Sequence, residues 1–231
     1  MKLKLLNEAE LTRLYESEMV HDFPKEELKP LRAMKRLMAM GRYDPLLVTE
    51  DGGSPRGYAM VWLPEDRRGA LLEFFAVLRG QRNGGLGAAT LDLLFERYGQ
   101  LFGEAEFPDS PDPEENELRR RRLGFYQRNG FRVLNYECAL FGVHFNCLYR
   151  GPEQNDQAIL TMHRGVYADY FSPPHLEHYI QLPLAPGEAI HPSPSWVEED
   201  EDEVFGTQPE VLFDSFSSKK KNEQPKQEAG E

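Results

Sequence analysis

One stretch of the sequence, residues 73–87, constrains the fold most, because an apolar run leads directly into a basic, glycine-rich turn. The residues that follow, about 86–102, favour a helix. Glycines let the main chain approach an anion closely, and the amide groups at the start of a helix point toward that anion. Arg79 and Arg82 add positive charge. The stretch therefore predicts a strand, a phosphate-binding loop and a helix, in that order.

The loop lacks the residues that two common phosphate-binding motifs require. A nucleoside-triphosphate loop has a lysine and a hydroxyl residue after its last glycine, but Gly87 is followed by Ala88 and Ala89. The dinucleotide motif G-x-G-x-x-G, aligned at Gly85, requires a third glycine where Thr90 stands. Neither class of nucleotide-binding protein fits this loop.

A third pattern, [QR]-x-x-G-x-[GA], does fit. Its six positions are occupied by Arg82, Asn83, Gly84, Gly85, Leu86 and Gly87. This loop resembles the acetyl-coenzyme A pyrophosphate loop of the GNAT acyltransferase superfamily. Residues 123–131, LGFYQRNGF, resemble the second signature of that family, F-Y-x-x-x-G-F, in which a helix ends at the glycine. Gly130 has the position of a helix C-cap, and Phe131 begins an alternating strand.

The remaining patterns agree in order with that family. With 231 residues, of which 40% are hydrophobic, the chain can form one sizeable core. Periodicity predicts strands and helices in alternation. Strands are expected at 2–6, 45–49, 57–63, 71–78, 104–107, 131–141, 144–150, 158–162 and 178–181, and helices at 8–19, 25–40, 86–102 and 113–129. The resemblance implies an α/β (α+β) GNAT fold, with a mixed, mostly antiparallel twisted sheet of about six to seven strands flanked by helices.

We expect three regions along the chain. Residues 1–150 would form the GNAT acetyltransferase core, and residues 151–185 would supply C-terminal strands that complete the sheet or the acceptor pocket. The segment 186–231 holds twelve acidic residues against four lysines, which is −8 of the formal net charge of −12. Such a composition favours disorder. Aromatic residues between 196 and 216 interrupt it, so the segment is expected to be a solubilising tail or a docking segment for a protein partner.

Several other functions are excluded by composition. No apolar run reaches the roughly eighteen residues of a membrane span, and the first residues do not resemble a signal peptide, so we expect a cytoplasmic protein without a membrane partner. A net charge of −12 argues against nucleic-acid binding. Cys138 and Cys147 are too few for a zinc site and are expected to be buried thiols. His175 and His178 lack further ligands, so no metal is expected.

Acetyl transfer from a thioester to an amine requires a proton for the departing sulfur. A thiol has a pKa of about 8.5, and a phenol with a pKa near 10 can supply that proton. Tyr126 is the candidate, and it matches the proton donor of the GNAT family. The alternative is a packing role, in which Phe125 and Tyr126 anchor their helix on the sheet.

An acceptor amine must also lose a proton. Glu73 is an acid within the apolar run 70–78, where an ionised carboxylate is costly unless it is paired or faces a cleft. GNAT enzymes often have a glutamate on this strand that deprotonates the amine, so the resemblance implies this role for Glu73. The alternative is a charge on the exposed face of the strand. Glu137 and Tyr58 are two further inward-facing candidates.

The resemblance implies further contacts with acetyl-CoA. The fourth and fifth strands of GNAT enzymes separate, and main-chain groups near Val77 and Arg79 would bind the pantetheine arm as an added half-strand. The chain departs from the family where Arg119 and Arg122 replace an asparagine and an alanine. These arginines are expected to form a solvated face, or to attract an anionic acceptor or the 3'-phosphate of the cofactor.

The resemblance to the GNAT family implies an acetyl-CoA-dependent N-acetyltransferase that acts by direct attack on the thioester. Tyr167, Tyr170, Phe171 and Tyr179 favour a covered pocket for a small-molecule amine. The alternatives are a protein or peptide N-acetyltransferase and a catalytically silent acyl-CoA-binding regulatory module. A homodimer is a further expectation.

Overall fold

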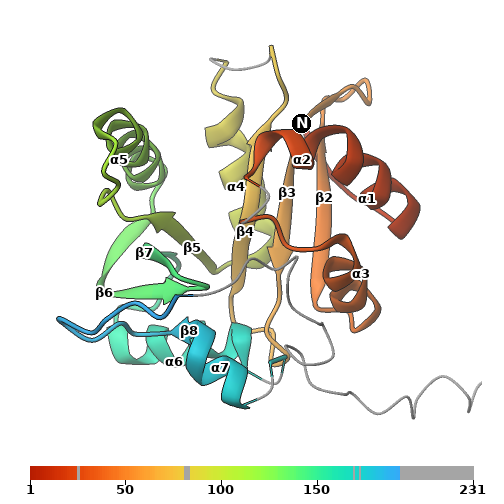
Figure 1. Ribbon diagram of the computed structural model, residues 1–231. Helices are drawn as coiled ribbons and strands as arrows, with labels where there is room; N and C mark the ends of the chain where they lie inside the picture. The colour runs from red at the N-terminus through yellow and green to blue at the C-terminus, as the bar shows by residue number, and fades with distance from the viewer. Residues whose placement is uncertain (25–26, 81–83, 169, 172, 193–231) are drawn as a thin grey trace, which may run out of the picture.

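The computed structural model describes residues 1–24, 27–80, 84–168, 170–171 and 173–192, and an eight-stranded sheet runs through this part of the chain (Figure 1). The strands are β1 (Lys2–Leu5), β2 (Tyr43–Thr49), β3 (Pro55–Trp62), β4 (Ala70–Val77), β5 (Leu101–Glu106), β6 (Arg132–Leu140), β7 (Val143–Arg150) and β8 (Ile180–Gln181). Their spatial order is β1-β2-β3-β4-β5-β7-β6-β8. Neighbouring strands are antiparallel, except that β4 and β5 run parallel.

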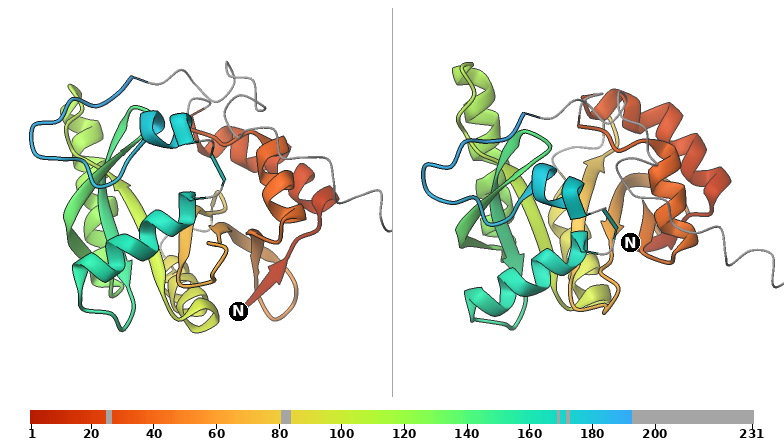
Figure 2. Two further views of the ribbon diagram at one scale, coloured as in Figure 1. Left: turned by 90° about the horizontal axis from the view of Figure 1, so that it is seen from below. Right: turned by 60° about the horizontal axis from the view of Figure 1, so that its bottom comes forward.

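Helices cover both faces of this sheet. The helical segments are α1 (Glu8–Leu14), a π-helical turn (Tyr15–Met19), α2 (Val20–Asp22), α3 (Leu31–Ala39), α4 (Leu86–Tyr98), α5 (Pro113–Arg128), α6 (Asp156–Tyr167) and α7 (Pro173–Tyr179). One buried cluster joins α1, α3 and α6 to one face of the sheet. A second cluster joins α4 and α5 to the opposite face. Figure 2 shows α1 and α3 beside β1–β3, with α6 on the β5–β7 side.

The sequence placed most elements within a few residues, but two boundaries and the number of strands differ. Helix α3 begins at Leu31 and not at 25, because the ring of Pro30 disfavours a helical conformation of the residue before it. Helix α4 ends at Gly99, which has a φ of 71° and closes the helix, so β5 begins earlier than expected. The sheet has eight strands and not six or seven. Of the strand expected at 178–181, only Ile180–Gln181 form β8, which adds to β6, whereas residues 178 and 179 end helix α7.

The expected strand at 158–162 is wrong, because this segment lies inside α6. The Asn155 side chain caps that helix by accepting hydrogen bonds from the N–H groups of Gln157 and Ala158, at 2.9 and 3.1 Å. The buried residues of α6 recur at helical spacing and include Ile159 and His163. Residues 151–185 therefore contribute two helices as well as a short strand.

The boundary of the acidic tail also shifts. The side chain of Gln181 donates to the Ala189 carbonyl at 2.9 Å and accepts from the N–H of His191 at 2.8 Å. These bonds tie residues 189–191 to β8, so the folded part continues past 186. The predicted disorder concerns mainly residues 193–231, which lie outside the described residues. Both cysteines, Cys138 and Cys147, are free and buried, as expected.

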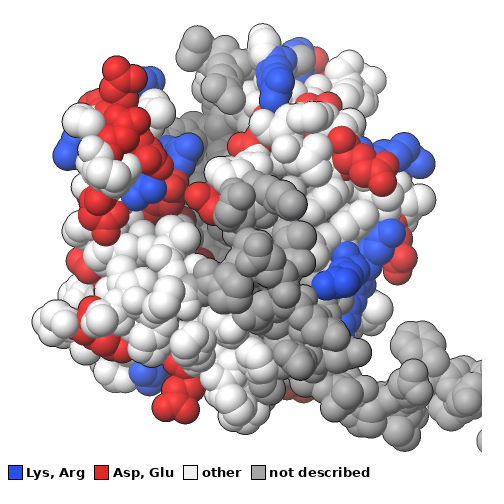
Figure 3. All heavy atoms as spheres, in the orientation of Figure 1, with Lys and Arg blue, Asp and Glu red and all other residues white. Residues whose placement is uncertain are grey.

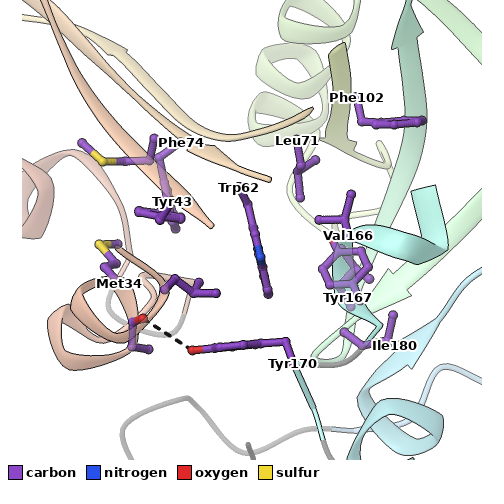
Figure 4. Packing of buried hydrophobic residues seen from close by; sticks show 14 of the residues in the cluster. Met34, Tyr43, Trp62, Leu71, Phe74, Phe102, Val166, Tyr167, Tyr170 and Ile180 are labelled. Atoms are coloured by element: carbon purple, nitrogen blue, oxygen red, sulfur yellow. Dashed lines mark hydrogen bonds between the residues drawn. The ribbon is translucent and has the colours of Figure 1, made fainter. Parts of the chain in front are cut away.

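An aromatic cluster around Trp62 joins the C-terminal segment to the core (Figure 4). The Trp62 ring is 1% exposed and meets Tyr167 and Tyr170 edge to face, with centroids 5.3 and 5.2 Å apart. The buried guanidinium of Arg42 donates to the Val166 carbonyl at 3.0 Å, which satisfies a carbonyl group in the last turn of α6. This face of the sheet is thereby covered by α6 and by Tyr170 and Phe171, which follow it.

Candidate active site

Strands β4 and β5 separate partway along their length. They pair only where Ala70–Leu72 face Leu101–Gly103. Beyond this point β4 stays paired with β3, and β5 with β7, so their facing edges have no strand partner within the described residues. The point of separation, with Glu73 and Glu104 as the first residues beyond it, is called the apex here. The separation implied by the family resemblance is therefore present.

Main-chain groups at Val77 face this open edge. The N–H of Leu78 donates to the Arg56 carbonyl at 2.9 Å, so Leu78 is bonded to β3. Neighbouring residues of a strand direct their N–H and C=O groups to opposite edges. The N–H and C=O of Val77 therefore point toward the gap, where an extended ligand could add to β4. This orientation is the one that the predicted role of Val77 requires.

The glycine loop meets the start of α4 as the sequence predicted. Gly85 is the N-cap residue and has a φ of 71°, which side chains disfavour. A Cβ atom at Gly84 or Gly85 would meet nothing within 4 Å, so the space beside the loop is open. A Cβ atom at Gly87 would lie 3.0 Å from the ring of Phe125, so a side chain there would require this ring of α5 to shift. Leu86 is the first helical residue, and the predicted Arg82 and Asn83 lie outside the described residues.

Arg79 lies at the rim of a surface hollow. This hollow, of about 460 Å³, is lined by His21, Asp22, Arg79 and Gly80. The guanidinium of Arg79 donates to the His21 carbonyl at 3.1 Å and lies 3.7 Å from the Asp22 carboxylate, but 67% of its side chain is exposed. A cation at the end of β4 therefore stays accessible to an anionic ligand.

Tyr126 lies in the last turn of α5, on the same face of the sheet as α4. Its ring meets Phe131 edge to face at 5.3 Å, and its neighbour Phe125 stacks on Phe75 of β4 at 6.5 Å. Burial raises the pKa of Tyr126 to about 12, although Arg122 opposes the shift. No hydrogen bond of its hydroxyl is found among the described residues. The phenol is therefore protonated at neutral pH and free to donate a proton.

The arginines of α5 are held by acids. Arg119 contacts Glu106, Asp109 and Glu115 at 3.2, 3.3 and 2.8 Å and is 13% exposed. Arg122 pairs with Glu106 as well, with 63% of its side chain exposed. Acidic and basic side chains are mixed over α5 in Figure 3. These arginines fasten α5 to the end of β5, so Arg119 in particular offers little charge to an acceptor.

Glu73 does not lie on an exposed face, which rules out one of the two sequence interpretations. The pairing of β3 with β4 shifts between Met60 and Val61, and Glu73 is the extra residue of this bulge. One of its carboxylate oxygens lies 2.6 Å from Lys29 Nζ, and the other accepts a hydrogen bond from Tyr43 at 2.6 Å. The side chain is 15% exposed. Glu73 is thus a largely buried, paired carboxylate at the apex.

The ammonium that pairs with Glu73 is itself buried. The Lys29 side chain is 1% exposed, and its Nζ lies 3.4 Å from the centroid of the Trp62 ring. Burial lowers the pKa of Lys29 to about 8, although Glu73 opposes the shift. Sequence reasoning missed Lys29, because its partner lies forty-four positions away and no local pattern joins the two.

A second carboxylate, Glu104, was also missed. It follows Gly103, which pairs with Leu72, so Glu104 and Glu73 occupy matching positions on the two strands. Glu104 accepts hydrogen bonds from Tyr167 at 2.6 Å and from His163 Nε2 at 2.9 Å. One feature of the sequence could have identified Glu104 as a site residue. It is an acid within the apolar run LFGEA, just as Glu73 is an acid within the apolar run 70–78. His163 was missed because the strand predicted at 158–162 ends before it and its partner lies fifty-nine positions away.

The two further candidates lie elsewhere. Tyr58 is fully buried and donates a hydrogen bond to Asp22 at 2.8 Å. Glu137 is 45% exposed and lies 2.8 Å from His144 Nε2, away from the apex. The structure therefore brings Glu73 and Glu104 together on the α1–α3–α6 face, and it places Tyr126 on the α4–α5 face. The open edges of β4 and β5 lie between these faces.

Comparison with solved structures identifies the architecture. An acetyltransferase described as belonging to the GNAT family, from Bacteroides thetaiotaomicron, superimposes with a TM-score of 0.60 over 72% of this chain and 96% of its own, at 21% identity. This chain has the GNAT fold. The predicted fold class is confirmed, and the glycine loop and the separated strands of this GNAT fold occupy neighbouring positions at one end of the sheet.

Two other solved structures are less similar. A spermidine N-acetyltransferase variant from Vibrio cholerae has a TM-score of 0.46 at 11% identity, covering 64% of this chain and 91% of its own. A protein from Corynebacterium glutamicum, described as histone acetyltransferase HPA2 and related acetyltransferase, has a TM-score of 0.44 at 17% identity and covers 67% and 97%. No family model and no curated protein matches the sequence.

Membrane-spanning helices and groups of metal ligands are both absent from the described part of this GNAT-fold chain. None of its helices is both long and apolar enough to cross a membrane. Within the same residues, no group of three or more His, Cys, Asp or Glu side chains is arranged to hold a metal ion.

The buried imidazole of His163 makes stability depend on pH. Burial alone would lower the pKa of His163, but Cys147 and Glu104 raise it to about 9. Tyr136, Cys138 and Tyr167 are the other titratable groups around it. Because the folded pKa exceeds the unfolded value near 6.5, this contribution is complete below pH 6.5 and is lost as the pH rises through 9. Denaturant unfolding should show that the free energy of unfolding falls more between pH 6 and pH 9 in the parent than in His163→Asn. An equal fall in both proteins would contradict the raised pKa of His163.

Proposed function

We propose that this protein is an acetyl-CoA-dependent N-acetyltransferase that acts on a primary amine of a small molecule. The observation that carries the proposal is the open edge between β4 and β5, with the glycine loop at its end and two largely buried carboxylates at its apex. Acetyl-CoA supplies an acetyl thioester when it is bound. Each part of that molecule has residues here that suit it.

The residues suit the cofactor in three places. Gly84 and Gly85 leave open space beside the first amides of α4, where a pyrophosphate would lie. The outward N–H and C=O of Val77 would bind an extended amide-containing arm. Arg79, at the rim of the hollow, would contribute charge to the phosphates. Arg82 and Asn83 stay predicted parts of the same loop.

Proton transfer in the proposed reaction needs a donor and an acceptor. Tyr126, whose hydroxyl has no hydrogen-bond partner among the described residues and whose pKa is raised to about 12, would give a proton to the departing sulfur. A carboxylate at the apex would take a proton from the amine, and Glu73 stays a prediction for this role. Placing donor and acceptor on opposite faces of the sheet suits a reaction in which the amine and the thioester enter from opposite sides.

The enclosure of the apex supports a small acceptor. Tyr167, Tyr170 and Phe171 are between 2% and 5% exposed and pack around Trp62, on the face that holds Glu73 and Glu104. A wide groove for a folded protein substrate would leave such rings exposed. The proposal is tested by following thiol release from acetyl-CoA with a panel of amines, polyamines, amino acids, aminoglycosides and peptides. Release only with peptides, or with no amine, would contradict it.

The loop assignment gives a binding prediction. Gly85→Asp adds a negative charge beside the proposed pyrophosphate position and forces a side chain onto a left-handed residue, so acetyl-CoA should bind about 10-fold more weakly or worse in calorimetry. Gly53→Asp is the matched control, because Gly53 has a φ of 82°, has nothing within 4 Å of its Cβ position, and lies in the β2–β3 turn. Equal weakening in both variants would assign the effect to backbone strain, not to the loop.

A further inference from the structure

Glu104 has one engaged oxygen and one free oxygen. Both Tyr167 and His163 donate to the same atom, Oε1. The other atom, Oε2, has no hydrogen-bond partner among the described residues, and it does not belong to their buried, unpaired polar atoms, so it keeps contact with solvent. The side chain as a whole is 10% exposed. A charged oxygen is therefore available at the end of a largely buried side chain.

Glu73 differs from Glu104 in this respect. Its Oε1 lies 2.6 Å from Lys29 Nζ, and its Oε2 accepts from the Tyr43 hydroxyl at 2.6 Å. Both oxygens are thus occupied by groups of the protein itself. An incoming ammonium would have to displace a buried partner from Glu73, whereas Glu104 can accept a new hydrogen bond without losing one.

We propose that Glu104, through Oε2, binds the ammonium group of the acceptor and accepts its proton. The inference rests on the proposed function and names the residue that performs this step. In the step, one N–H bond of the ammonium breaks and an O–H bond forms at Oε2, while the nitrogen keeps the electron pair and becomes nucleophilic. The proton then passes to solvent, with which Oε2 is in contact. The acceptor class is a primary amine that is cationic in solution.

His163 and Tyr167 are positioning residues for this carboxylate. His163 is fully buried and its ring stacks on Phe102, with centroids 4.7 Å apart. The ring of Tyr167 is held edge to face against Trp62. Two rigid donors on one oxygen fix the rotation of the carboxyl group and so direct Oε2 toward the apex. Both donors come from α6, which gives the segment after residue 150 a role in the reaction.

The test compares Glu104→Gln with Glu137→Gln, using the best amine from the thiol-release panel. Glu137 is the matched control, since it also pairs with a histidine at 2.8 Å but lies away from the apex. Glu104→Gln is expected to lower kcat/KM for the amine by about 100-fold or more, the range of general base catalysis, with acetyl-CoA affinity unchanged. The kcat/KM of Glu137→Gln for the same amine should stay within about twofold of the parental value, because this residue takes no part in the proposed proton transfer.

Tyr167→Phe tests the positioning role and does not depend on the stability of the Glu104 variant. It removes one donor to Oε1 and keeps the ring packing, so kcat/KM should fall about 10-fold, and the acidic limb of its pH profile should move. Parental kcat/KM and an unchanged pH profile in Glu104→Gln would overturn the inference. If that variant does not fold, the same result in Tyr167→Phe would overturn it.

Failure of the inference is distinct from failure of the proposed function. The double variant Lys29→Met/Glu73→Gln replaces both charges of the ion pair by neutral side chains. If this variant loses activity while Glu104→Gln stays active, Glu73 accepts the proton, and the protein is still an acetyltransferase. No thiol release from the parent with any amine would reject the proposed function, and with it the role of Glu104.

Discussion

Replacing Tyr126 by phenylalanine is expected to lower turnover by about 10- to 1000-fold with any accepted amine. The change deletes the phenol and keeps the ring, so the contacts with Phe125 and Phe131 remain. Because the pKa of Tyr126 is about 12, the donor is protonated throughout the neutral range, and the loss should not depend on pH below about 10. Steady-state kinetics of the parent and of Tyr126→Phe from pH 6 to 9 measures this loss of turnover.

Tyr98→Phe is the control for this prediction. Tyr98 is the last residue of α4, packs on the same face, and donates a hydrogen bond to Asp44 at 2.6 Å. Its loss should cost roughly 1 kcal/mol of stability and leave turnover unchanged. Acetyl-CoA affinity should be parental in both variants. Parental turnover in Tyr126→Phe would reduce Tyr126 to the packing role that its neighbour Phe125 also performs.

Removing one partner of the Lys29–Glu73 pair is expected to cost about 3–5 kcal/mol of folding free energy. The two charged atoms lie 2.6 Å apart, with side chains 1% and 15% exposed, so neither group can turn to water when its partner is lost. Lys29→Met and Glu73→Leu should each be strongly destabilised. The double variant should recover most of the loss, because an apolar pair of similar volume replaces a buried ion pair.

Denaturant unfolding of the parent, the two single variants and the double variant gives the coupling free energy. The exposed pair Lys4–Glu10 is the control, since its atoms are also 2.6 Å apart but its side chains are 54% and 23% exposed. Solvent screens this pair, so its cycle should show little coupling. A double Lys29–Glu73 variant as unstable as the sum of its singles would show that the pair is not coupled.

The elements that the sequence predicted correctly are those whose signal is local. Each of these features is recognised from residues within one element or at its end. They are the glycine loop, the helix C-cap at Gly130 and the acid within β4. The start of α3 and the helix α6 were predicted wrongly. For α3 the helix was predicted but Pro30 sets a later start, and for α6 the apolar pattern after the cap Asn155 suits either a strand or a helix.

The partners at the apex could not be predicted, because each pair joins distant parts of the chain. Glu104 and His163 are fifty-nine residues apart, and Lys29 reaches Glu73 from the loop before α3. The homodimer, the protein partner of the tail and the cytoplasmic location stay predictions. The sequence by itself determined the positions of the glycine loop and of most helices and strands, which follow from backbone conformation and periodicity, while its two signatures supplied the resemblance that implies the GNAT fold and the proton-donor candidate Tyr126. Only the tertiary structure decided which carboxylate oxygen at the apex is free, because that depends on which side chains the packing of α3 and α6 brings within hydrogen-bond distance.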